Sequence, residues 1–136
     1  MHQDALNAVR ACRAAEKEQA LFYRTLAAAA EMEGDEATSE RLQQLHADEQ
    51  HHLSRLTARL MELGAALPDL AGMRAPAIAL TDWETLAHER EAEEVRRYEA
   101  LLATATLDEA TLALVEQILE VERHHARDLG GKWTMA

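Results

Sequence analysis

Residues that interrupt helices are confined to a few short stretches of this chain. All five glycines and both prolines lie at residues 34, 64–76 and 130–131. Glycine and proline destabilise the interior of a helix, so the long intervals without them are where helices can run uninterrupted. Within these intervals apolar residues recur every three or four positions, which is the spacing of one helix face. We therefore predict four helices, at residues 4–32, 36–63, 82–104 and 107–130.

Short polar sequences mark the expected starts of three of these helices. The sequences TDWE at residues 81–84 and TLDE at residues 106–109 match the capping box. In that motif a Thr hydroxyl and a Glu carboxylate satisfy the first free N–H groups of a helix. Asp35 is expected to cap the second helix in a similar way.

The lengths of the connections predict how the helices are paired. Helices joined by only a few residues pack as antiparallel neighbours, which applies to the first and second helices and to the third and fourth. The segment 64–81 is longer and, when extended, can run the length of a bundle. We therefore predict an all-α fold of two antiparallel helical hairpins joined by a long crossover. It would form one domain over residues 1–130, followed by a C-terminal tail at 131–136 that either lacks fixed structure or docks Trp133 on a neighbour.

The composition argues against several classes of protein. Aromatic residues make up only 4% of the chain, and no strand-like alternation of β-branched residues is visible, so a β-sheet is not expected. The net charge of −11 argues against nucleic acid and anionic membranes as partners, because both attract basic surfaces. The single cysteine, Cys12, permits neither an internal disulfide nor a CxxC metal site, and it is expected to be a small core residue. With no recognisable signal peptide, we expect a cytoplasmic protein.

Acidic residues interrupt the predicted inner face of every helix near its midpoint. The second and fourth helices each carry a Glu-x-x-His pair, and the first and third each carry a Glu followed seven residues later by a Tyr. The chain therefore resembles a duplication, in which each half contributes one helix of either kind. The first half supplies Glu16, Tyr23, Glu49 and His52, and the second supplies Glu91, Tyr98, Glu122 and His125.

Four carboxylates at one level of a bundle core require counter-charge. An unpaired charge buried in apolar surroundings is penalised by several kcal/mol. Two divalent cations would neutralise four carboxylates, and a mixture of carboxylate oxygen and imidazole nitrogen suits iron, manganese or zinc. We therefore predict that the four glutamates and two histidines bind two metal ions.

The stretch EKEQALFY, from Glu16 to Tyr23, and the two Glu-x-x-His pairs resemble the ferritin-like di-iron carboxylate superfamily, and most of all the rubrerythrin family. The resemblance covers nearly the whole chain. It implies a ferritin-like four-helix bundle that holds two iron ions, or manganese or a mixed pair. The implied ligands are Glu16 and Glu91 as terminal carboxylates, Glu49 and Glu122 as bridging carboxylates, and His52 and His125 as one imidazole for each metal.

Three further residues have roles that only the resemblance implies. Glu94, one turn beyond Glu91, is similar to an additional carboxylate of rubrerythrins that can exchange with histidine as the metals change oxidation state. Tyr23 and Tyr98 would donate hydrogen bonds that hold the ligand carboxylates in place. From the residues alone, Glu94 could instead be a surface charge beside Arg97, and the tyrosines could be plain core aromatics.

Other acidic residues and histidines have simpler interpretations. Glu18 and Glu93 are expected on solvated faces, although Glu18 would replace Glu16 if the register of the first helix were shifted. A metal-free bundle, whose glutamates and histidines all face solvent, is the alternative to the whole site. The histidines expected at the surface are His46, His51, His88 and His124.

The leading functional hypothesis is an enzyme, a di-iron or di-manganese oxidoreductase that reduces hydrogen peroxide or dioxygen. Rubrerythrins usually carry a four-cysteine rubredoxin domain, and this chain has one cysteine, so turnover would need an external electron donor. One alternative is a ferroxidase or iron-storage protein, with Fe(II) as its substrate and a large closed assembly. Another is a metal-binding sensor without turnover. A homodimer is expected, because dimers are common among similar proteins.

Overall fold

Four α-helices account for most of the chain. The computed structural model describes the backbone of residues 1–134 and the side chains of residues 1–130. The helices are α1 (Gln3–Met32), α2 (Glu36–Glu62), α3 (Trp83–Thr104) and α4 (Glu109–Thr134), and residues 1–134 contain no strand. The prediction of an all-α protein with four helices is confirmed, with an architecture that fits a four-helix bundle.

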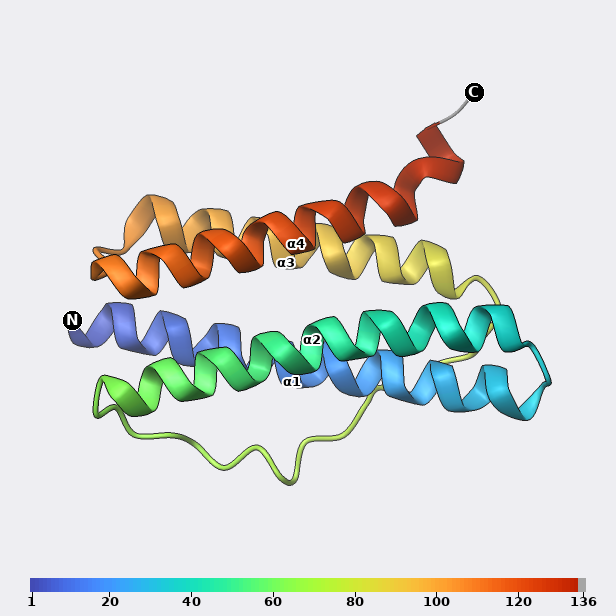
Figure 1. The fold of residues 1–136 in the computed structure, drawn as a ribbon, viewed down its shortest axis with the longest axis horizontal. Helices are drawn as coiled ribbons and strands as arrows, with labels where there is room; N and C mark the ends of the chain where they lie inside the picture. The colour runs from blue at the N-terminus through green and yellow to red at the C-terminus, as the bar shows by residue number, and fades with distance from the viewer. Residues whose placement is uncertain (135–136) are drawn as a thin grey trace.

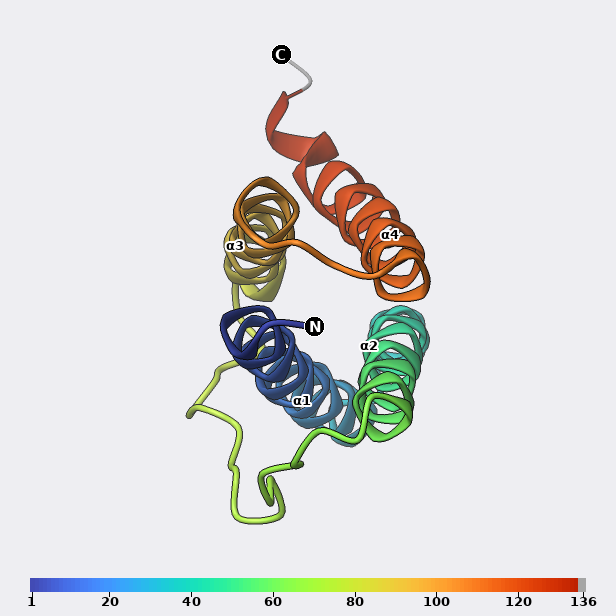
Figure 2. The ribbon, with the colours of Figure 1, turned by 90° about the vertical axis from the view of Figure 1, so that its left-hand side faces the viewer.

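The closest helix packing is within two pairs, the first helix with the second and the third with the fourth. Helix α1 lies beside α2 along most of its length, and α3 lies beside α4 (Figure 1). Viewed from one end, α1 also faces α3, and α2 faces α4, so the four helices surround a common interior (Figure 2). The segment 63–82 passes along the outside of α1 and α2 from one end of the molecule to the other (Figure 1).

The N-cap of α2 agrees with the prediction, whereas the caps predicted for the next two helices do not. Asp35 caps α2 by accepting a hydrogen bond from the Thr38 N–H at 3.2 Å, as predicted. The capping box predicted for α3 is wrong, because the N-cap is Asp82 and its side chain makes no capping bond. A capping residue normally has an extended backbone, but Asp82 is left-handed, with φ of 57°.

The capping box predicted for α4 is also wrong. Asp108, rather than Thr106, accepts a hydrogen bond from the Thr111 N–H, at 2.8 Å. Helix α4 therefore begins at Glu109, two residues later than predicted. A carboxylate caps a helix at least as well as a Thr hydroxyl, so the nearer Asp108 takes the position.

Glycine ends the first helix but not the last. Gly34 follows α1 with φ of +75°, a conformation that favours glycine, and the chain reverses there into α2. Gly130, by contrast, lies inside α4, which continues to Thr134 beyond its predicted end. A Cβ at Gly130 would lie 2.7 Å from the His88 ring, so this glycine serves close helix packing. The predicted tail thus overlaps α4, while the predicted docking of Trp133 falls outside the described side chains.

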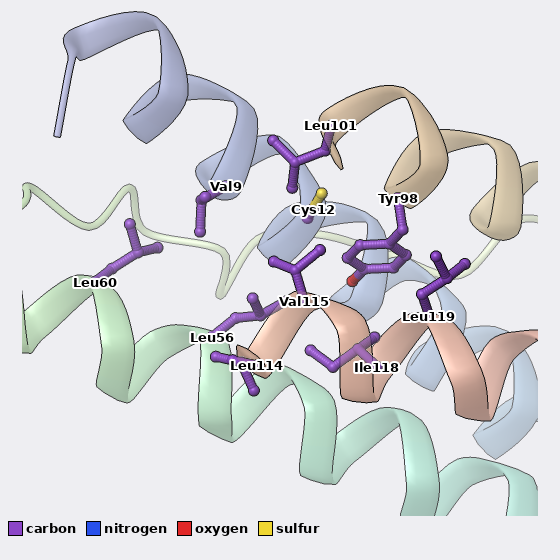
Figure 3. Packing of buried hydrophobic residues seen from close by; sticks show 10 residues of the cluster. All are labelled: Val9, Cys12, Leu56, Leu60, Tyr98, Leu101, Leu114, Val115, Ile118 and Leu119. Carbon is purple, nitrogen blue, oxygen red and sulfur yellow. The ribbon is translucent and has the colours of Figure 1, made fainter. Parts of the chain in front are cut away.

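Two apolar clusters fill the interior on either side of a polar layer. All four helices contribute to each cluster, and burial of one Leu or Phe side chain contributes about 1.5–3 kcal/mol. The first cluster, shown in Figure 3, comprises Val9, Cys12, Leu56, Leu60, Tyr98, Leu101, Leu114, Val115, Ile118 and Leu119. The second comprises Phe22, Tyr23, Leu26, Ala27, Ala30, Leu42, Leu45, Trp83, Ala87 and Leu129. The polar layer interrupts the apolar face of every helix, and none of the described helices has an apolar stretch long enough to cross a membrane.

Candidate metal centre

Four glutamates and two histidines meet in the polar layer between the apolar clusters. Each of these side chains is at most 5% exposed. They form two groups of four, and in each group the potential ligand atoms all lie within 4.8 Å of one another. We call them the His52 group (Glu16, Glu49, His52 and Glu122) and the His125 group (Glu49, Glu91, Glu122 and His125).

The two groups share two carboxylates and each has one imidazole. Glu49 and Glu122 belong to both groups, whereas Glu16 belongs only to the His52 group and Glu91 only to the His125 group. The structure therefore brings the carboxylates predicted to bridge into the shared positions. The buried cluster could hold a metal ion in either group.

Both imidazoles present the same nitrogen to the carboxylates. Nδ1 of His52 lies 3.6 Å from Oε1 of Glu16 and 3.6 Å from Oε1 of Glu122. Nδ1 of His125 lies 3.4 Å from Oε1 of Glu49, 3.6 Å from Oε1 of Glu91 and 3.3 Å from Oε1 of Glu122. These separations are too long for good hydrogen bonds. They are the separations expected of ligand atoms arranged around one metal ion.

The hydrogen-bonding deficit of the described side chains is concentrated in this layer. Nine buried side-chain atoms have no hydrogen-bond partner, and all belong to the six clustered residues or to Glu94. They include Nδ1 of both histidines and both carboxylate oxygens of Glu49 and Glu122. Leaving a buried charged or polar group unpaired is costly, so orphaned atoms are rare in folded proteins. Cations bound among them would satisfy carboxylate oxygens and imidazole lone pairs together, so the residues fit the predicted metals.

Burial, together with mutual repulsion, raises the pKa values of the shared carboxylates. Burial, and then the charges of Glu122, Glu16 and Glu91, raise the pKa of Glu49 well above its usual range. Burial likewise raises the pKa of Glu122, although its interaction with His125 opposes the shift. Burial lowers the pKa of His125, but interactions with Glu122 and Glu91 outweigh it and raise the value to about 11. Protons thus compete with any cation for this layer.

Two tyrosines hold the unshared carboxylates, and they do so across the molecule. The Tyr23 hydroxyl on α1 donates to Oε1 of Glu91 on α3 at 2.6 Å. The Tyr98 hydroxyl on α3 donates to Oε1 of Glu16 on α1 at 2.7 Å. Burial and the neighbouring carboxylates raise the pKa of both phenols well above 10, so both remain protonated donors. The tyrosines are therefore buried core aromatics that also position carboxylates.

Glu94 is buried beside the cluster but belongs to neither group. Its carboxylate pairs with Arg97 at 2.6 Å, while its second oxygen has no partner. Burial and the charge of Glu16 raise the pKa of Glu94 to about 8, and Arg97 opposes the shift. The interpretation of Glu94 as a surface charge is wrong, because its side chain is 7% exposed, although Arg97 is indeed its partner.

Two residues that contact the centre were not predicted as site residues. Gln19, on the inner face of α1, donates from Nε2 to Oε1 of Glu91 at 3.2 Å and accepts from Arg90 at 2.8 Å. Its position three residues after Glu16 was a signal for this role. Asp48 lies 2.8 Å from Nε2 of His125, with Oδ2 as the acceptor. No pattern within α2 indicates that contact, because the partner lies on α4.

The remaining candidates lie away from the centre. Glu18 and Glu93 are exposed, and Glu18 pairs with Arg90 at 3.0 Å, so the register with Glu16 inside is correct. Cys12 is buried, and burial raises its pKa to about 12. Of the histidines expected at the surface, His51 and His124 are exposed, whereas His46 and His88 are half-buried.

Comparisons with known proteins do not assign this chain to a family. It matches no protein-family model, and a search of curated proteins finds no match.

Proposed function

We propose that this protein is an oxidoreductase that reduces hydrogen peroxide or dioxygen at a centre of two iron or manganese ions. The observation that supports the proposal most is the sharing of Glu49 and Glu122 between the two ligand groups. Shared carboxylates keep two ions adjacent, which single-metal sites do not require. Reduction of peroxide consumes two electrons and two protons and gives two molecules of water, so two adjacent one-electron metals match the demand.

The proposed ligand set follows the grouping of the side chains. Glu16 and His52 would serve one ion and Glu91 and His125 the other, with Glu49 and Glu122 bridging. Glu94 would be an additional carboxylate on the Glu16 side, held by Arg97 at 2.6 Å. Even with Glu94 as a seventh protein ligand, positions remain for substrate on two ions of this kind.

The chain's own residues would prepare the site for chemistry in three ways. When bound, two such metals supply one electron each and polarise oxygen. Tyr23 and Tyr98 fix the orientation of the unshared carboxylates through hydrogen bonds of 2.6 and 2.7 Å. The apolar clusters on either side exclude water, which strengthens electrostatic interactions within the layer.

We also propose that the protein is related to the rubrerythrins that it resembles. The bundle would then be a ferritin-like arrangement of two antiparallel hairpins joined by the crossover. Because the chain has one cysteine, a separate electron donor would return two electrons in each cycle. A homodimer is part of the same proposal.

A stopped-flow experiment tests the function directly. Protein purified without oxygen and loaded with two Fe(II) per chain is mixed with hydrogen peroxide, and separately with dioxygen. We expect both irons to be oxidised with consumption of one peroxide, and repeated turnover when a reductant is supplied. Glu91→Gln should slow the oxidation at least about tenfold, whereas Glu89→Gln, an exposed glutamate on the same helix, should not change it.

The outcome separates this proposal from the other two hypotheses. Continued uptake of iron well beyond two per chain into a large closed assembly would indicate ferroxidase and storage activity. Oxidation no faster than that of free Fe(II), with the metals still bound, would indicate a binding or sensing role and contradict the enzyme.

A further inference from the structure

The two imidazoles of the centre are supported differently on the side away from the carboxylates. Nε2 of His125 lies 2.8 Å from Oδ2 of Asp48. Among the described side chains, Nε2 of His52 has no carboxylate within ion-pair distance, and its Nδ1 faces Glu16 and Glu122 as Nδ1 of His125 faces Glu91 and Glu122. The two groups thus have similar inner donors and unequal outer partners.

The difference can be traced to one position of the internal repeat. Asp48 immediately precedes Glu49 on α2, and Val121 immediately precedes Glu122 on α4. Asp48 reaches the histidine on the opposite helix, so Val121 is the residue in the corresponding place for His52. A valine cannot accept a hydrogen bond, which leaves the His52 ring without that support.

The described surroundings of His52 also lack an acceptor for its outer nitrogen. His52 and Val121 both line a surface pocket of about 410 Å³ between α2 and α4. Arg55, also in the lining, donates to Gln117 at 2.9 Å and offers His52 no acceptor. Glu120, the acidic residue of this lining, lies 3.8 Å from Arg127. The outer edge of the His52 ring therefore faces the pocket, while that of His125 faces a carboxylate.

We propose that Asp48 is a positioning residue for His125, and that its absence opposite His52 makes the two metal positions of the centre chemically different. The inference rests on the proposed two-metal function. Asp48 accepts a hydrogen bond from the Nε2–H of His125, which fixes the tautomer so that the lone pair of Nδ1 points to the metal. The negative charge of Asp48 also makes the imidazole a stronger metal ligand, because it stabilises the cation-bound form.

The size of the effect follows from the exposure of Asp48. Outer partners of metal-binding histidines typically change metal affinity by 10- to 100-fold. The Asp48 side chain is 52% exposed, so solvent screens its charge, and the lower end of that range, about tenfold, is expected. Glu94 adds a second difference on the Glu16 side, so the test compares each position with its own variant rather than one position with the other.

Co(II) binding to three variants tests the proposal, with affinities measured by competition with a chelator. Asp48→Asn should weaken one of the two binding steps about tenfold and leave the other unchanged. Val121→Asp, which supplies the missing carboxylate, should strengthen the other step. Asp128→Asn is the matched control, since it removes the same charge from an exposed residue on α4 whose ion-pair partner is Arg41, at 3.6 Å. It should leave both steps within about twofold.

Proton NMR of the Co(II)-loaded protein gives a readout that a purely structural role would not change. Each metal-bound imidazole has one exchangeable, strongly shifted N–H signal. In the wild type we expect one signal that exchanges slowly, from His125, and one that exchanges fast, from His52. Asp48→Asn should speed the slow signal at least about fivefold, and Val121→Asp should slow the fast one.

The outcomes separate the inference from the function on which it rests. If the wild type binds two Co(II) but Asp48→Asn behaves like Asp128→Asn in affinity and exchange, the positioning role is overturned while the two-metal centre stands. If the wild type binds no Co(II), both are overturned. Should Val121→Asp fail to fold, the comparison of Asp48→Asn with Asp128→Asn decides the question alone.

Discussion

The helix pair α1–α2 and the helix pair α3–α4 carry the same inner residues but different surroundings. Each pair supplies a lone glutamate, a Glu-x-x-His and a tyrosine that bonds the other pair's glutamate. The residues that surround these ligands differ between the two pairs. Gln19 on α1 corresponds to Glu94 on α3, and Asp48 on α2 corresponds to Val121 on α4. The similarity therefore covers the atoms that could bind metal, whereas the difference lies in the residues that would tune each metal.

Replacing a shared carboxylate should have the largest effect, because both ligand groups contain it. Glu49→Gln should abolish binding of at least one metal, seen as a loss of at least about 100-fold in affinity. The same variant should make the metal-free protein more stable by about 1–2 kcal/mol at pH 8, because the buried Glu49 carboxyl must either take up a proton or bury a charge on folding, and glutamine does neither.

These two effects have opposite signs, which distinguishes them from general damage to the fold. Metal content is measured by elemental analysis and stability by urea unfolding. Glu40→Gln, at an exposed position of the same helix, is the control and should change neither quantity. Unchanged metal stoichiometry in Glu49→Gln would show that the bridging assignment is wrong.

Removing the metal should lower the free energy of unfolding, because the carboxylates of the polar layer then lose their counter-charge. At a free metal concentration 100-fold above its dissociation constant, each ion adds about 2.7 kcal/mol to the free energy of unfolding. The metal-free protein should also lose stability as the pH rises from 5 to 9. The pKa of Glu94 is raised to about 8 and those of Glu49 and Glu122 are raised as well, so the folded state holds protons that the unfolded state releases above pH 4.5.

His125 acts in the same direction. Its pKa is raised from 6.5 to about 11, so its contribution to stability is complete below pH 6.5 and is lost as the pH rises through 11. The total loss between pH 5 and 9 should be about 2 kcal/mol or more. Metal-loaded protein should show the reverse trend below pH 7, since protons then displace the ions. Thermal unfolding across this range checks both trends, and parallel curves for the two forms would argue against a charged, metal-dependent layer.

The two tyrosines should differ, and this smaller effect sharpens the comparison between the helix pairs. Glu16 loses its one hydroxyl donor in Tyr98→Phe, whereas Glu91 in Tyr23→Phe keeps the Gln19 amide at 3.2 Å. We expect Tyr98→Phe to weaken metal binding about tenfold and Tyr23→Phe about threefold. Isothermal titration with Mn(II) measures both. Equal losses would mean that Gln19 does not support Glu91.

The interior could be predicted from periodicity because burial follows helix geometry. In α2 the step of three or four residues identifies Leu42, Glu49, His52 and Leu56 as inward, and all four are buried. The same reasoning chose Glu16 over Glu18. A residue's face on its own helix was therefore sufficient to find the clustered ligands.

Contacts between helices could not be predicted in the same way. Asp48 is a site residue only because His125 of α4 packs beside it, and nothing in the spacing of α2 records that partner. Gly130 was expected to end a helix, but the ring of His88 on α3 makes it a packing position. Asp108 caps α4 through one hydrogen bond that competes with the predicted Thr106 cap. These contacts depend on distances between helices, which the spacing of residues along the sequence does not reveal.

Metal analysis of protein purified without oxygen tests the central claim most directly. The account predicts two iron or manganese ions per chain in the wild type, and at most one in Glu49→Gln. A wild-type protein that contains no metal, takes up none when it is added, and remains equally stable from pH 5 to 9 would contradict it.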